Sequence, residues 1–195
     1  MQDTNSPPPA PAPDKVFLFS GHMIDRPDRA EPRFPADKES IAAARIAQAL
    51  DNLGAGPGDL AFAQGAAGGD ILFAEACLAR GLTFQMLLPF PEAEFIAASV
   101  LPSANGEAWH QRYLNLRQRL KLPARILPDD VEVLHSAEDG RPLEKHDQLD
   151  PYARCNLWLL NSALSRGLSR LRFICLWNGG GGDGPGGTAH MVMEI

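Results

Sequence analysis

Three glycine-rich segments are the parts of this chain best suited to binding an anion. They read FSGHMID at 19–25, QGAAGGD at 64–70 and GGGGDGPGGT at 179–188. Glycine lets the backbone approach a phosphate closely, and the free N–H groups at the start of a following helix add partial positive charge. The two shorter segments also suit ordinary turns, whereas a turn seldom needs as many glycines as the third segment has. We therefore expect the third segment to hold a ligand.

The polar side chains in and near these segments extend the candidate site. Asp70 either orients a sugar hydroxyl or caps the helix that follows, and the two roles are compatible. Asn156 is an amide on an otherwise apolar helical face, so it needs a partner, which is either backbone or a ligand. The expected ligand-binding residues are Ser20, Gly21, His22, Gly65, Gly68, Gly69, Asp70, Asn156, Asp183, Gly184, Gly186, Gly187 and Thr188.

Few side chains near the glycine segments can act as an acid or a base. Glu75 is the one acid in the apolar stretch ILFAEACLA, where it is either solvated at one edge or partly buried within a site. His190 follows the last glycine segment, where capping or packing is the alternative role. Both are catalytic candidates. Arg26, Arg29 and Arg33 follow the first segment and either close over an anion or pair with neighbouring acids.

Several common ligand motifs are absent from the sequence. The lysine of a P-loop does not follow the glycines, because Gly187 and Thr188 lead into Ala189. No G-x-G-x-x-G fingerprint follows the first apolar run, and the histidines and cysteines have no metal-ligand spacing. We therefore expect neither a metal nor a resident cofactor.

Alternating strand and helix patterns surround the glycine segments. Short apolar runs predict strands at 15–21, 59–65, 82–90 and 171–177, with one more at 124–127 or 131–135. Apolar residues at helical spacing predict helices at 38–53, 70–81, 106–121 and 151–166. This alternation indicates an α/β, Rossmann-like three-layer sandwich with a mostly parallel central sheet. Because parallel strands end at one edge of a sheet, the three glycine segments should meet there.

Composition and charge narrow the possible partners and locations. With 18 basic and 24 acidic side chains, the net charge of −6 argues against a broad nucleic-acid or membrane-binding surface. Cys77, Cys155 and Cys175 lie among apolar neighbours and predict buried free thiols, which favours a reducing, cytoplasmic location. Residues 1–14 are proline-rich and typical of a disordered tail, so the domain should span 15–195.

The glycine segments resemble those of the SLOG superfamily, which joins the Lonely Guy phosphoribohydrolases, the DNA-processing protein A family and a set of nucleotide-ligand sensor domains. The stretch GAAGGDILFAEACLARG is similar to the superfamily's second glycine loop and its following helix. The stretch GDGPGGTAHM is similar to its P-G-G-x-G-T-type phosphate loop, and FSGH corresponds to its first, weaker glycine motif. The resemblance covers the chain from about Val16 onward.

The resemblance implies a nucleotide or nucleotide-derived ligand. Its phosphate would rest on the third glycine segment, and the first two segments would line the same cleft. The implied contacts are Gly186, Gly187 and Thr188 for the phosphate, with Ser20, Gly21, Gly68 and Gly69 lining the cleft. Superfamily members usually continue past the last helix to another strand, which predicts a domain excised from a longer protein. We also expect a homo-oligomer.

The resemblance also bears on catalysis. Enzymes of the group place a glutamate just after the threonine of the phosphate loop, whereas this chain has Ala189 and His190 there. Glu194 lies farther along the predicted helix and would face differently. A binding or sensing module that regulates an attached or associated effector is therefore favoured over an enzyme. Two alternatives stay open, a phosphoribohydrolase that releases the base from a nucleoside monophosphate and a non-catalytic scaffold for protein interactions.

Overall fold

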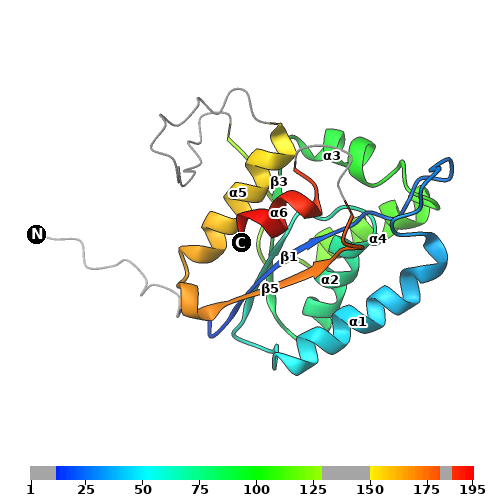
Figure 1. Ribbon diagram of the computed structural model, residues 1–195. Coiled ribbons are helices and arrows are strands. Elements are labelled where there is room, and N and C mark those ends of the chain that lie inside the picture. Colours follow the sequence, from blue (N-terminus) through cyan, green and yellow to red (C-terminus); the bar gives the residue numbers. More distant parts are fainter. Residues whose placement is uncertain (1–11, 129–149, 181–185) are drawn as a thin grey trace, which may run out of the picture.

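The computed structural model describes residues 12–128, 150–180 and 186–195. Its five-stranded sheet is parallel throughout, with the strand order β4-β3-β2-β1-β5 and helices on both faces, so the predicted Rossmann-like three-layer sandwich is confirmed (Figure 1). The strands are β1 Val16–Gly21, β2 Leu60–Ala63, β3 Thr83–Leu88, β4 Arg125–Ile126 and β5 Leu171–Leu176. The helices are α1 Glu39–Asn52, α2 Gly69–Ala79, α3 Glu92–Ser99, α4 Gly106–Arg119, α5 Pro151–Leu164 and α6 Thr188–Glu194, with short 3-10 turns at η1 Ala36–Lys38 and η3 Leu168–Arg170.

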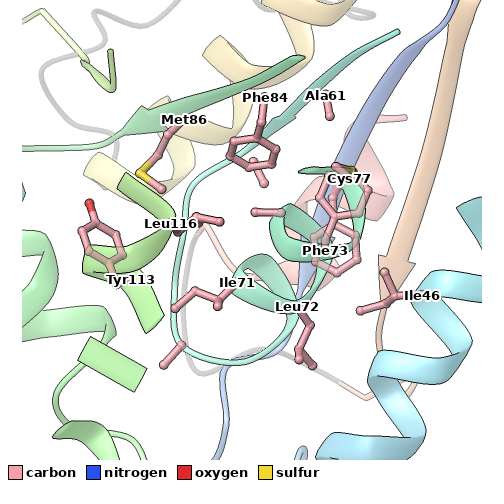
Figure 2. Close-up of a cluster of buried hydrophobic side chains, with 14 of the residues drawn as sticks. Ile46, Ala61, Ile71, Leu72, Phe73, Cys77, Phe84, Met86, Tyr113 and Leu116 are labelled. Carbon is pink, nitrogen blue, oxygen red and sulfur yellow. The ribbon is translucent and has the colours of Figure 1, made fainter. Parts of the chain in front are cut away.

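Alternate residues of the strands pack into cores on opposite faces of the sheet. Phe17 and Phe19 of β1 belong to the core formed with α1, α2 and α4, whereas Val16 and Leu18 belong to the core formed with α5 and α6. Figure 2 shows the first core, where side chains of these helices meet those of β2 and β3. Within it the rings of Phe19 and Phe73 stack at a centroid distance of 4.6 Å. Because both faces are covered, the strands read as continuous apolar runs.

The helix and strand patterns of the sequence are largely confirmed. The four predicted helices correspond to α1, α2, α4 and α5, and α5 begins as expected, since the Asp150 side chain accepts hydrogen bonds from the N–H groups of Tyr152 and Ala153. The short strand β4 agrees with the alternative at 124–127. The sequence pattern does not predict α3, because only Phe95 and Ser99 of that helix are buried and the apolar stripe is narrow.

Two expectations from the sequence are wrong. Helix α2 is capped by Gly68 and not by Asp70, because Asp70 lies in the first turn and its carboxylate bonds back to the preceding loop. Cys77 and Cys155 are buried free thiols as predicted, but Cys175 is exposed. It lies on β5, which is an edge strand and is covered less completely than the central strands.

Some of the predictions fall outside the described residues. These are the tail at 1–11, the alternative strand at 131–135, and Asp183 and Gly184 of the third glycine segment. Pro13, near the end of the expected tail, contacts the domain, since its carbonyl accepts a hydrogen bond from Arg170 at 2.7 Å.

Candidate functional site

The first two glycine segments meet at the carboxyl edge of the sheet. Met23 and Gly68 form an isolated antiparallel bridge, and the N–H of Gly69 donates to the carbonyl of His22 at 3.1 Å. Gly68 has a φ of +108°, and a Cβ atom at this position would lie 2.6 Å from the backbone nitrogen of Ile24. Only glycine satisfies both the backbone angle and the close approach, so the two loops depend on it to form one surface.

The third glycine segment is held at both of its described ends. At one end, Nε2 of His22 bonds at 3.1 Å to Oδ1 of Asn178, the residue directly before the segment. At the other end, Nδ2 of Asn156 donates to the carbonyl of Gly186 at 2.7 Å. The backbone of Gly186 packs directly on α5, since a Cβ atom there would lie 2.5 Å from the nitrogen of Ala153. The segment is therefore anchored to the first glycine loop and to α5.

A cavity of about 280 Å³ lies where the glycine segments meet α3 and α5. This volume is close to the lower end of the range for small-molecule sites, which begins at roughly 300 Å³. The predicted ligand-binding residues that line the cavity are Ser20, Gly21, His22, Asp70, Asn156, Gly186, Gly187 and Thr188. Gly65, Gly68 and Gly69 are not among the lining residues and form the backbone of the loops behind it.

Asp70 contributes a buried carboxylate to this cavity. The residue is 7% exposed, and its Oδ2 atom accepts hydrogen bonds from the N–H groups of Gly65 at 3.0 Å and Ala66 at 3.1 Å. Burial raises the pKa of Asp70 to about 6, although the two amide hydrogen bonds act in the opposite direction. A buried carboxylate with a raised pKa in a cavity is typical of a binding or catalytic site.

Arg33 gives the cavity a cationic side chain on the side of the first glycine segment. Its loop is fixed by Asp25, whose Oδ2 atom accepts hydrogen bonds from the N–H groups of Arg33 and Phe34, each at 2.9 Å. Burial lowers the pKa of His22, the hydrogen bond with Asn178 raises it, and the charge of Arg33 lowers it again. The neutral form of His22 is thus favoured near neutral pH, and Arg33 supplies the positive charge.

Side-chain hydrogen bonds tie the walls of the cavity together. Nε2 of Gln64 donates to Oδ1 of Asn156 at 3.1 Å, and Asn156 in turn donates to Gly186. The hydroxyls of Ser99 and Tyr152 share a hydrogen bond of 2.7 Å. These bonds connect the residue after β2 with α5 and the third glycine segment, and α3 with α5, so they fix the polar side chains of the cavity wall.

The two catalytic candidates are not among the residues that line the cavity. Glu75 forms a two-point ion pair with Arg112, at 3.0 and 2.6 Å, and Arg112 also pairs with Glu39 at 2.7 Å. This network joins α1, α2 and α4. His190 lies 3.7 Å from Glu194 within α6. Neither Glu75 nor His190 lines the cavity, and the ion pairs of Glu75 favour a structural role for that residue.

Sequence reasoning does not single out several side chains that complete the cavity. Tyr152 and Leu159 lie four residues before and three residues after Asn156 on α5, so their helical spacing could have identified them. Gln64 directly follows β2, a position that also faces the carboxyl edge. Ser99 belongs to α3, and without that helix no sequence signal places it near the site.

No protein-family model matches the chain, and no curated protein matches it either. Within the described ranges, no three His, Cys, Asp or Glu side chains are grouped as metal ligands would be. Among the described helices none is both long enough and apolar enough to cross a membrane. The fold and the site define a Rossmann-like α/β domain with a cavity of mixed polar and apolar lining at the carboxyl edge of its sheet.

Proposed function

We propose that this chain is a SLOG-type domain that binds or senses a nucleotide or nucleotide-derived ligand in this cavity. The observation that carries the proposal is the convergence of the three glycine segments on one cavity at the carboxyl edge of a parallel sheet. In open α/β sheets, ligands bind at this edge because loop amides and helix starts collect there. Regulation of an attached or associated effector is part of the same proposal.

The chemistry of the cavity walls supports a ligand with charged and apolar parts. Arg33 and the glycine backbone suit a phosphate, which binds to positive charge and to closely approaching N–H groups. Phe19, Met23 and Leu159 add apolar surface on which a base can pack. Asp70 offers a carboxylate to a hydrogen-bond donor of the ligand.

The two glutamates weighed as acids for hydrolysis of a glycosidic bond do not line the cavity. A phosphoribohydrolase needs an acid near the glycosidic carbon, and Glu75 and Glu194 both lie outside the cavity and contact other side chains. Asp70 is the carboxylate that lines the cavity within the described part of the chain. The effector, the homo-oligomeric state and the cytoplasmic location stay predictions from the sequence.

A thermal-shift panel tests the proposal. Nucleoside monophosphates, NAD, ADP-ribose and cyclic nucleotides are added in excess, and each compound that stabilises the fold is then examined by chromatography for release of its base. A ligand that binds only the native state raises the midpoint temperature of unfolding, and at excess ligand this rise grows with the logarithm of the ligand concentration. We expect stabilisation by at least one compound that stays intact.

A pair of arginine variants makes the panel specific to the cavity. Arg33→Met removes the cation from the cavity wall, whereas Arg45→Met changes an arginine of α1 that bonds to Gln48 on the same helix. The stabilisation should shrink in the first variant and persist in the second. A flat panel would reject nucleotide binding and leave the scaffold alternative, and turnover to free base would replace sensing by hydrolysis.

A further inference from the structure

The two oxygens of the buried Asp70 carboxylate have different surroundings. Both hydrogen bonds from the protein, donated by Gly65 and Ala66, end on Oδ2. Oδ1 receives no hydrogen bond from the described residues, although Asp70 is only 7% exposed and lines the cavity. Oδ1 is not itself a fully buried atom, so it is open to a hydrogen-bond donor that a ligand brings into the cavity.

The occupied Oδ2 atom restricts what the ligand can offer. A group with two parallel N–H donors, such as the edge of guanine or a guanidinium, binds a carboxylate through both oxygens. Here one oxygen already holds two backbone amides, so a ligand meets a single acceptor. A lone hydroxyl group matches this acceptor better than a two-point donor does.

The amides of the cavity are partly held by protein partners. Gln64 donates to Asn156, and Asn156 donates to Gly186. Side-chain amides are the groups that match the mixed donor and acceptor edge of a base. These two bonds fix the orientation of both amides and leave fewer of their donors and acceptors for the edge of a base.

We infer that Oδ1 of Asp70 accepts a hydrogen bond from a hydroxyl group of the ligand's sugar ring, so that the site selects a ribose over the corresponding deoxyribose. The inference rests on the proposed function. It adds the part of the ligand that is recognised and the residue that recognises it.

Calorimetric titration of the wild-type chain tests this selection. The probes are the 5′-monophosphates of the four common ribonucleosides, each compared with its 2′-deoxy and its 3′-deoxy counterpart. A hydrogen bond to a charged acceptor predicts that loss of the recognised hydroxyl weakens binding about ten- to a hundredfold. Equal affinities for ribose and both deoxyribose forms would overturn the inference alone, whereas no binding of these monophosphates or of any compound in the thermal-shift panel would overturn the proposed function.

Two aspartate variants assign the effect to Asp70. Asp70→Asn keeps an oxygen for the amides of Gly65 and Ala66 but removes the charge, so the preference for ribose should fall to about threefold or less. Asp59→Asn changes another buried aspartate, at the opposite end of β2, and should keep the full preference. A preference that survives in Asp70→Asn would overturn the assignment. If that variant does not fold, the comparison of ribose and deoxyribose forms in the wild-type chain still decides the inference.

Discussion

Two buried aspartates lie beside opposite ends of β2, and their hydrogen bonds differ. Asp59, 3% exposed, uses both oxygens, since Oδ1 accepts the N–H of Lys15 and Oδ2 accepts the N–H of Gly56, each at 2.9 Å. The Lys15 ammonium lies 3.6 Å from Oδ2. Asp70 uses Oδ2 alone, and no cation is among the causes of its pKa shift. The same residue type thus has both oxygens bonded at one end of the sheet and one oxygen without a donor from the described residues at the other.

Physical chemistry explains why only one of these ends resembles a site. A buried carboxylate whose oxygens are all bonded and which has a cation nearby is compensated for the loss of water. Asp70 is compensated in part, and burial therefore raises its pKa to about 6. Natural proteins keep such incompletely satisfied groups mainly where a function requires them.

The largest expected loss of stability is that of Gly68→Ala, and Gly54→Ala at the other end of the sheet is its control. Gly68→Ala should lower the free energy of unfolding by about 4 kcal/mol, because φ is +108° and the new methyl would meet the backbone of Ile24. Gly54→Ala should cost about 1 kcal/mol, because φ is +62° but no atom lies within 4 Å of the new methyl. Urea denaturation measures both changes. Equal losses in the two variants would show that the close approach at Gly68 is unimportant.

The next largest expected effect concerns Asp59, whose two carboxylate oxygens both accept hydrogen bonds. Asp59→Ala should lower the free energy of unfolding by about 3 kcal/mol, because the amides of Lys15 and Gly56 lose their acceptors. Asp37→Ala serves as the control, since its ion pair with Lys38 is exposed and should contribute less than about 1 kcal/mol. Nucleotide affinity should be unchanged in both. A weaker affinity in Asp59→Ala would contradict the division of roles between the two ends.

Asp70→Asn is expected to raise the free energy of unfolding near neutral pH, whereas the two preceding substitutions lower it. The Asp70 pKa of about 6 in the folded chain exceeds the ordinary value of 3.8, so its contribution to stability is fully present below pH 3.8 and is lost as the pH rises through about 6. Asp70→Asn removes this loss and should raise the free energy of unfolding at about pH 7 by about 2 kcal/mol. Parallel denaturation curves from about pH 4 to pH 7 measure the difference between the two proteins. A variant that is less stable than the wild type at each pH would contradict the prediction.

The smallest expected effect concerns Glu75, whose carboxylate pairs with Arg112. Glu75→Gln weakens the partly exposed ion pair with Arg112 and should cost no more than about 1 kcal/mol. Glu39→Gln weakens the other ion pair of the same arginine and should cost about the same. Neither variant should alter nucleotide binding or base release in the panel. If Glu75→Gln lost nucleotide binding or base release and Glu39→Gln did not, Glu75 would be restored as a catalytic candidate.

Much of the fold could be predicted from the sequence, because its signals are local. Apolar runs, helical spacing and the pair Asp150 and Pro151 identify β1, β2, β3, β5 and four helices without reference to distant residues. The role of Asp70 is predicted less well by the sequence. An aspartate at the start of a helix often caps it, but here the preceding loop turns back so that the N–H groups of Gly65 and Ala66 reach the carboxylate of Asp70.

The sequence by itself determined that this chain alternates strands and helices and that its glycine segments follow parallel strands, because local spacing and turn residues are sufficient for both. The tertiary structure alone decided which polar groups satisfy one another. Gln64 and Asn156 are 92 residues apart and bond to each other, while one oxygen of Asp70 is left facing the cavity. Such pairings depend on the packing of β2 against α5, and no local pattern records them.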